Sequence, residues 1–188
     1  MIHVLMISLD TALALHPQGD SRARHLAYAA RAGKLTVICY TPPHTGGAIQ
    51  ASDSLTIIPT NSRHPVFFIL DAIRLAERSL RKATIQLVTT QDPFATGIVG
   101  VWLRLRHHVP LLVQNHSYFF GNREWLAERP LRNRILRALG GIVVARADFY
   151  RTVNEKEKQN YLAAGGSRRR VAALPLGTAS PAFADPPD

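Results

Sequence analysis

The chain has 188 residues, 46% of them hydrophobic and 19% charged, with a formal net charge of +10 and a single cysteine. This length favours one domain with a substantial core. No apolar run reaches the ~18–20 residues that span a bilayer, and the lone Cys39 excludes an internal disulfide, which favours a reducing cytoplasm. The basic surface attracts nucleic acid, anionic lipid or phosphorylated ligands without distinguishing among them.

Short apolar runs alternate with amphipathic stretches along the whole chain. The opening residues, "MIHVLMISLD", lack a basic leader and predict a first strand instead of a signal peptide. Strands are expected at 2–9, 34–40, 54–59, 84–90, 110–115, 148–153 and 170–176. Helices are expected at 21–33, 65–83, 93–108, 122–147 and 154–166, and the segment 41–53, with its prolines and glycines, is expected to be a mobile loop. This alternation predicts an α/β, Rossmann-like fold: a mostly parallel sheet with helices on both faces.

We expect one domain over residues 1–176, followed by an interdomain linker at 177–188, where the composition turns to small residues and proline. In open α/β sheets, ligands bind beyond the carboxyl ends of the strands, so the loops that follow the strands are the candidate sites.

The loop after the first strand contains Gly19, which lets a backbone approach a ligand closely, and Asp20 or Ser21 as the cap of the next helix. A helix start of this kind receives phosphate groups, but the same residues also suit an ordinary loop and cap. Arg24 follows within the helix and is a candidate anion ligand.

Two further loops carry unexpected polar residues. Asp92 precedes Pro93, a combination that predicts the cap and first residue of a helix and leaves direct ligand contact as the alternative. The run "LLVQNHSY" ends a buried strand on Asn115, His116 and Ser117, where a histidine can exchange a proton or hydrogen-bond a sugar hydroxyl, or be purely structural.

A basic tract follows, with Arg129, Arg132, Arg134 and Arg137 beside an apolar stripe of Leu131, Ile135 and Leu139. We expect the stripe to pack on the sheet and the arginines to attract an anionic membrane surface. No zinc, nucleophile-elbow or nucleic-acid-binding pattern is present, so we expect no metal site and no nucleic-acid partner.

The order of these segments resembles the N-terminal domain of the GT-B glycosyltransferases of family 4, also called group 1. The resemblance covers nearly the whole chain and rests on "SLD…GDSRARHLAYA", "IPTNSRHPVFFILDAIRLA", "LVTTQDPFATGIVGVWLRLRHHVPLLVQNH", "RADFYRTVNEKEKQNYLAAGG" and "VAALPLGT". It implies a hexosyltransferase of bacterial polysaccharide or glycolipid synthesis that uses a nucleotide-sugar donor, retains configuration and needs no essential metal. In this family the N-terminal domain holds the acceptor and a second Rossmann-like domain holds the donor.

The resemblance also implies roles for particular residues. Gly19, with Asp20, matches the loop that faces the donor phosphates, and His116 matches the histidine near the reacting sugar, hence the expected catalytic residue. Asp92 matches the acid of an "HDP"-like motif, although Gln91 replaces the histidine and the first loop has one glycine instead of a pair. We expect the acceptor to be bound by Arg24, Asp92, Asn115 and Ser117.

The paired glutamates of the family's C-terminal donor-binding domain have no counterpart in the 188 residues, so we expect the isolated chain to be inactive. The expected partners are a sugar or lipid-linked acceptor, that second domain and an anionic membrane surface, with a cytoplasmic location at the inner face of the membrane. The alternative is a non-catalytic Rossmann-like module that binds membrane or a partner subunit. A GT-B epimerase is a third reading, which the local motifs match less well.

Overall fold

The computed structural model describes residues 1–174, and the expected linker 177–188 lies outside them. Within the described residues the strands are β1 (Ile2–Ser8), β2 (Gly33–Cys39), β3 (Ile49–Ser52), β4 (Leu55–Pro59), β5 (Leu87–Thr90), β6 (Leu111–Asn115), β7 (Phe149–Thr152) and β8 (Val171–Ala173). The helices are α1 (Ala12–Leu15), α2 (Asp20–Ala32), α3 (Phe68–Lys82), α4 (Ala95–His107), α5 (Arg123–Glu128), α6 (Pro130–Arg146) and α7 (Glu155–Ala163), with 3₁₀ turns η1 (Pro65–Phe67) and η2 (Arg168–Arg170).

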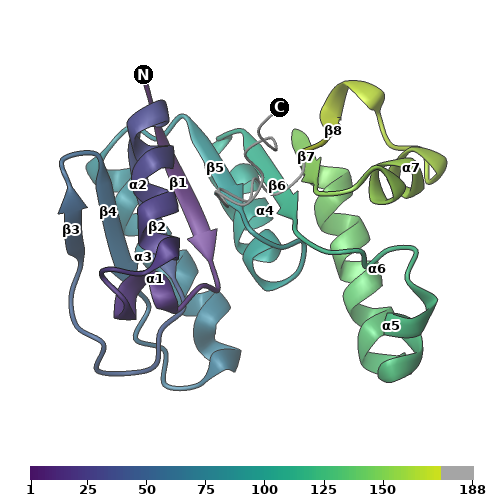
Figure 1. Cartoon of the computed structure of the whole chain (residues 1–188), viewed down its shortest axis with the longest axis horizontal. Coiled ribbons are helices and arrows are strands. Elements are labelled where there is room, and N and C mark those ends of the chain that lie inside the picture. The colour runs from purple at the N-terminus through teal and green to yellow at the C-terminus, as the bar shows by residue number, and fades with distance from the viewer. Residues whose placement is uncertain (175–188) are drawn as a thin grey trace, which may run out of the picture.

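The strands form one sheet in the order β3-β4-β2-β1-β5-β6-β7-β8 (Figure 1). Every neighbouring pair is parallel except β3 and β4, which are antiparallel. Parallel neighbours require crossover connections. Helices supply them, except that β2 is joined to β4 by residues 40–54, which include β3 and no helix. The predicted α/β, Rossmann-like fold with a mostly parallel sheet is confirmed.

The core lies on both faces of the sheet because successive strand residues point to opposite sides. In β1, Leu5 and Ile7 join the core that α3, α4 and α6 cover, whereas Val4 and Met6 join the core beneath α1 and α2. Such double burial explains why the central strands are continuous apolar runs. Cys39 at the end of β2 is buried, as predicted, and this burial raises the pKa of its thiol to about 12.

The segment 41–53 differs from its prediction as a loop because its last residues form β3. Ile49 pairs with Ile57 of β4, and Thr56 donates a hydrogen bond of 2.9 Å from Oγ1 to Gln50 Oε1. The turn between the two strands is only Asp53 and Ser54, so a hairpin closes where the sequence showed polar and turn-forming residues.

The apolar stripe of α6 does not pack on the sheet, although the sequence predicted that it would. Leu131 and Ile135 are 77% and 52% exposed, and Leu139 and Ile142 continue the exposed row. The helix instead buries a different face, formed by Asn133, Gly140, Val143 and Val144. Gly140 permits this choice, because a Cβ at that position would lie 3.0 Å from the ring of Phe94 and 3.1 Å from that of Phe120.

Close contacts also hold α4. A Cβ on Gly100 would lie 2.7 Å from both Leu111 Cδ1 and Thr90 Cγ2. The lack of a side chain at Gly100 therefore lets α4 pack closely against the sheet. A Cβ on Gly97 would lie 2.7 Å from Val143 Cγ1, which places that glycine against α6 instead of the sheet.

Gly100→Ala should therefore lower the free energy of unfolding by about 1–3 kcal/mol, because the added methyl group overpacks the contact between α4 and the sheet. Gly141→Ala is the matched control, since nothing lies within 4 Å of a Cβ there, and it should raise stability by about 0.5–1 kcal/mol through helix propensity. Urea unfolding of the two variants measures both effects. Equal effects of the two substitutions would contradict the close contact at Gly100.

Candidate functional site

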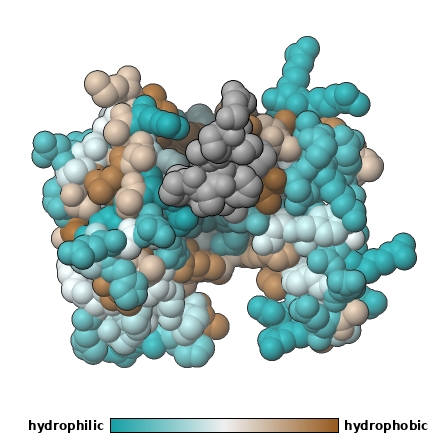
Figure 2. Space-filling model, in the orientation of Figure 1, coloured by the Kyte–Doolittle hydropathy of each residue, from teal (hydrophilic) through white to brown (hydrophobic). Residues whose placement is uncertain are grey.

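The carboxyl ends of the parallel strands meet at one edge of the sheet, toward which the arrow of β1 points in Figure 1. Figure 2 shows a deep indentation in this edge, between the part of the molecule that carries α1 and the part that carries α5. Crevices at this edge are the usual ligand sites of open α/β sheets. The loops after β1, β5 and β6 therefore define the candidate site.

Side chains tie the ends of β1 and β5 to the start of α2. Ser8 donates a hydrogen bond of 2.5 Å from Oγ to Gln91 Oε1 and accepts one of 2.9 Å from the backbone N–H of Asp10. The hydroxyl of Ser21 donates to Asp10 Oδ2. Sequence reasoning missed the roles of Asp10 and Gln91, whose only sequence signal was their position immediately beyond a strand.

No side chain caps the start of α2, whereas the sequence predicted Asp20 or Ser21 as the cap. Gly19 is the N-cap residue, Asp20 is an exposed acid in the first turn, and neither Asp20 nor Ser21 serves as the side-chain cap. The first N–H groups of any helix lack intrahelical acceptors, and the helix dipole makes this end positive. Gly19 and Asp20 thus lie where an anionic group would be favoured, and the exposed Arg24 follows on the first turns of the same helix.

Asp92 is mainly engaged in local structure. Helix α4 begins at Ala95, later than the pair Asp92-Pro93 predicts, yet the carboxylate accepts hydrogen bonds of 2.6 Å from the backbone N–H of Phe94 and 2.7 Å from the hydroxyl of Thr96. Burial raises the pKa of the Asp92 carboxyl, and these hydrogen bonds oppose that rise. The acid therefore organises the turn between β5 and α4 at the edge of the crevice.

His116 follows directly on β6 and is half-buried. Burial lowers the pKa of its imidazole, and the positive charges of Arg151 and Arg24 lower it further. The two charges act on the ring from different elements, Arg24 from α2 and Arg151 from β7. A ring with such a lowered pKa is neutral at pH 7, so one nitrogen can accept a proton while the other donates a hydrogen bond.

Arg151 belongs to a row of polar side chains that crosses three strands on the sheet face next to His116. Its Nη1 donates a hydrogen bond of 2.7 Å to Gln114 Oε1, and Gln114 Nε2 donates one of 3.1 Å to Thr89 Oγ1. Arg151 also donates to the backbone carbonyl of Leu174 at 3.1 Å. The row fixes a positive charge near the histidine.

The two residues beside His116 have different surroundings. Asn115 is 1% exposed, and its Nδ2 donates hydrogen bonds of 2.9 Å to the hydroxyl of Tyr150 and to Glu157 Oε1. Ser117 is exposed, and its backbone N–H donates to Asn115 Oδ1 at 3.2 Å. The Asn115 amide thus shapes the turn that carries His116, whereas the Ser117 hydroxyl is open to solvent.

Glu157 lies in the first turn of α7, and its carboxylate is buried. Asn154 caps this helix by accepting a hydrogen bond of 2.7 Å from the backbone N–H of Glu157. The Glu157 carboxylate turns into the core, where Oε1 also accepts from the backbone N–H of Phe120 at 3.2 Å. It thereby holds both ends of the segment from Asn115 to Phe120.

Aromatic rings anchor the far side of this segment. Phe119 packs between Phe94 and Trp125, with ring centroids 5.1 and 5.3 Å apart. Asn122 caps α5 by accepting a hydrogen bond of 3.0 Å from the backbone N–H of Trp125. The loop after β6 is therefore attached to α4, α5 and α7 at once.

The arginines of the basic tract lie apart from His116, on α6 and at its start. Arg129, Arg132, Arg134 and Arg137 are all exposed. Within residues 1–174, no helix is long and apolar enough to cross a membrane, and no group of three or more His, Cys, Asp or Glu side chains is arranged to hold a metal ion.

The structure thus gathers Gly19, Asp20, Arg24, His116 and Ser117 around one edge, with Asp92 at the nearby turn. Of the remaining expected residues, Asn115 lies in the core behind His116, and the four arginines form a separate surface.

The pKa of His116 should lie below 6.5, and Arg24→Gln should raise it by removing a nearby positive charge. In the wild type, the folded state favours the neutral ring of His116 more than the unfolded state does. The free energy of unfolding should therefore decrease as the pH falls below 6.5 and the unfolded chain takes up the proton first. An NMR titration of the ring protons measures the pKa directly. Arg31→Gln, at the opposite end of α2, is the control and should leave it unchanged; a wild-type pKa at or above 6.5 would contradict this description of the site.

Comparison with known proteins identifies the family and the type of fold. The profile of the family described as "Glycosyl transferase 4-like domain" matches residues 19–177. No curated protein matches the chain.

Similar solved structures include UDP-GlcNAc 2-epimerase from Neisseria meningitidis bound to UDP-GlcNAc, with 12% identity, a TM-score of 0.58 and coverage of 92% of this chain and 45% of that one. Another is HepE from Anabaena in complex with UDP and glucose, with 13% identity, a TM-score of 0.56 and coverage of 97% and 48%. A third is MnaA from S. aureus with UDP, with 12% identity, a TM-score of 0.59 and coverage of 92% and 43%. These likenesses establish the GT-B type of fold, and the chain spans less than half the length of each structure. The chain belongs to the glycosyl transferase 4-like domain family.

Proposed function

We propose that the chain is the acceptor-side half of a retaining glycosyltransferase that moves a sugar from a nucleotide-linked donor to a polysaccharide or lipid-linked acceptor. The observation that carries the proposal is the half-buried His116 directly after β6, at the edge of the sheet where the parallel strands end. Family membership supports a glycosyltransferase type of domain. The donor class is supported by the UDP-GlcNAc and UDP named for the similar structures.

In this proposal the crevice residues divide the work. The positive start of α2, at Gly19 and Asp20, faces the phosphates of the donor, because free backbone N–H groups and the helix dipole favour anions. His116 hydrogen-bonds the transferred sugar through its neutral ring. Arg24 and Ser117 bind acceptor groups from opposite sides, while Asp92 and Asn115 hold the two loops in position through the hydrogen bonds described above.

A second domain completes the site. The similar structures are more than twice as long as the part that this chain matches. The resemblance to the family 4 glycosyltransferases implies that a C-terminal Rossmann-like domain recognises the donor. We therefore propose that the donor nucleotide is bound between the crevice edge and that domain. We propose that the transfer needs no essential metal, as the resemblance to the family 4 glycosyltransferases implies.

His116→Ala in the complete enzyme should lower turnover about 10²–10⁴-fold, the range typical of a positioned proton-transfer or hydrogen-bonding group, with little effect on unfolding. Steady-state sugar transfer and thermal unfolding measure the two quantities. His108→Asn is the control: His108 is exposed at the end of α4, in a left-handed conformation that asparagine tolerates, and turnover should stay at the wild-type value. Full turnover by His116→Ala would remove His116 from the mechanism.

The exposed stripe of α6 favours a second property, attachment to an anionic membrane surface. Leu131, Ile135 and Leu139 are exposed beside Arg132, in the arrangement typical of helices that lie in the membrane interface. We propose that this surface holds the protein at the cytoplasmic face of the membrane. The same surface would serve a non-catalytic binding module.

Vesicles of anionic phospholipid should bind the chain in a co-sedimentation assay, and neutral vesicles should bind it much less. Simultaneous Arg132→Glu, Arg134→Glu and Arg137→Glu should weaken binding at least tenfold, because each basic residue near such a surface contributes about 1 kcal/mol. The control is Arg106→Glu at the end of α4. Binding that is insensitive to lipid charge or to added salt would contradict the proposal.

A further inference from the structure

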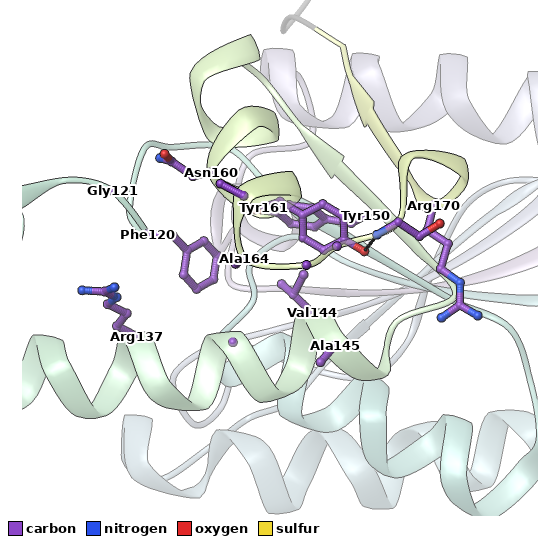
Figure 3. Close-up of a pocket in the computed structure, with 15 residues that line it drawn as sticks. Phe120, Gly121, Arg137, Val144, Ala145, Tyr150, Asn160, Tyr161, Ala164 and Arg170 are labelled. Atoms are coloured by element: carbon purple, nitrogen blue, oxygen red, sulfur yellow. Dashed lines mark hydrogen bonds between the residues drawn. The ribbon is translucent and has the colours of Figure 1, made fainter.

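A groove of about 660 Å³ lies between α6 and α7, away from the crevice edge (Figure 3). Its walls include Phe120, Val144, Tyr150 and Tyr161, so most of its surface is aromatic or aliphatic. The volume lies within the range of roughly 300–1,000 Å³ typical of sites for small organic ligands. Nothing in the proposed sugar-transfer chemistry uses this groove.

Small residues keep the groove open on both sides. Gly141 and Ala145 line it from α6, and Gly165 ends α7 with a φ of +87° that only glycine adopts readily. A Cβ on Gly141 would meet nothing within 4 Å, so the space in front of that residue is free. Larger side chains at such positions would fill the groove, which makes it a property of this sequence.

Positive charges mark both ends. Figure 3 shows Arg137 at one end and Arg170 at the other, with the rings of Phe120 and Tyr161 between them. Within residues 1–174 neither arginine forms an ion pair. Guanidinium groups match phosphate geometry closely, through paired hydrogen bonds.

A second cavity of about 500 Å³ adjoins the end of the groove at Arg137. It is lined by Arg123, Arg134 and Arg137, together with apolar residues of α5 and the start of α6. Arg137 lines both cavities. An apolar groove therefore adjoins a cavity that three arginines line, which is an arrangement complementary to a molecule with one apolar chain and one anionic head.

We propose that this groove binds a single anionic lipid, with its hydrocarbon chain between α6 and α7 and its phosphate at Arg123, Arg134 and Arg137. The lipid is the acceptor of the transfer, a role that rests on the proposed function. Phe120 connects the two regions, since it lines the groove and ends the segment that carries His116. A lipid seated there touches the segment that presents the catalytic group.

The groove differs from the exposed stripe in shape and position. Leu131 and Ile135 line neither cavity and form a convex row, suited to a bilayer surface. The groove is a hollow between α6, α7, β7 and the loop after β6, suited to one chain. Arg132 also lies outside both cavities, although it is on the same helix as Arg137 and is equally exposed.

Isothermal titration calorimetry with dodecyl phosphate, kept below its micelle concentration, tests the proposal on the chain itself. The wild type should bind one molecule. Inorganic phosphate, which lacks the chain, and dodecyltrimethylammonium, which carries the opposite charge, should bind at least tenfold more weakly. Arg137→Glu and Gly141→Leu should each reduce the affinity at least tenfold, the first through the head and the second by filling the groove. Arg132→Glu is the matched control and should bind like the wild type.

Absence of dodecyl phosphate binding by the folded wild type would overturn the lipid site. Equal losses in Arg137→Glu and Arg132→Glu would also overturn it, because they would assign the binding to general surface charge. These outcomes are independent of His116→Ala turnover, which tests the sugar-transfer chemistry alone. In the complete enzyme, Arg137→Glu should raise KM for a lipid phosphate acceptor with little change in kcat; a wild-type KM would overturn the acceptor role.

Discussion

The buried carboxylate of Glu157 is the interaction on which both proposed sites depend. It is 1% exposed and accepts hydrogen bonds from the Asn115 amide and from the backbone N–H of Phe120, residues that lie far from it in the sequence. Burial raises the pKa of this carboxyl, and the hydrogen bonds from Phe120 and Asn115 oppose that rise. Since His116 lies between the two donors and Phe120 walls the groove, one side chain of α7 aligns the crevice and the lipid site together.

Electrostatics gives the two regions a common preference. Part of the positive charge of the chain lies where ligands would carry phosphate: Arg24 and the start of α2 at the crevice, and Arg123, Arg134 and Arg137 at the cavity beside the groove. The positive charges at the crevice also lower the pKa of His116, so they keep the histidine neutral while they favour anionic substrates. A nucleotide-sugar donor and a lipid phosphate acceptor would both be drawn to this surface.

Much of the fold could be predicted from the sequence because burial on both faces makes parallel strands continuous apolar runs, as in β1 and β2. Strand β3 was missed because Ile49–Ser52 is short and follows a run of prolines and glycines, and its pairing with β4 is a tertiary fact. The stripe of α6 was misread because helical spacing shows that residues share a face but not which face packs. Gly140 decided that choice, by letting two aromatic rings approach the opposite side.

The candidate site was predictable only in outline. Positions beyond strand ends drew attention to Gly19 and His116, and the structure places both along one edge of the sheet. The electrostatic coupling of His116 to Arg24 and the inward turn of Glu157 depend on contacts between distant segments, which no local pattern encodes. The groove between α6 and α7 was likewise invisible, because its walls come from β7, two helices and the loop after β6.

The most direct test of the central claim is a crystal structure of the complete protein with a bound nucleotide-sugar. The account predicts that the sugar lies at the carboxyl edge of the sheet, with a His116 ring nitrogen within about 3 Å of a sugar oxygen, a hydrogen-bonding distance. It also predicts that the diphosphate lies between the start of α2 and the second domain. A sugar bound away from the end of β6, with no contact to His116, would contradict the account.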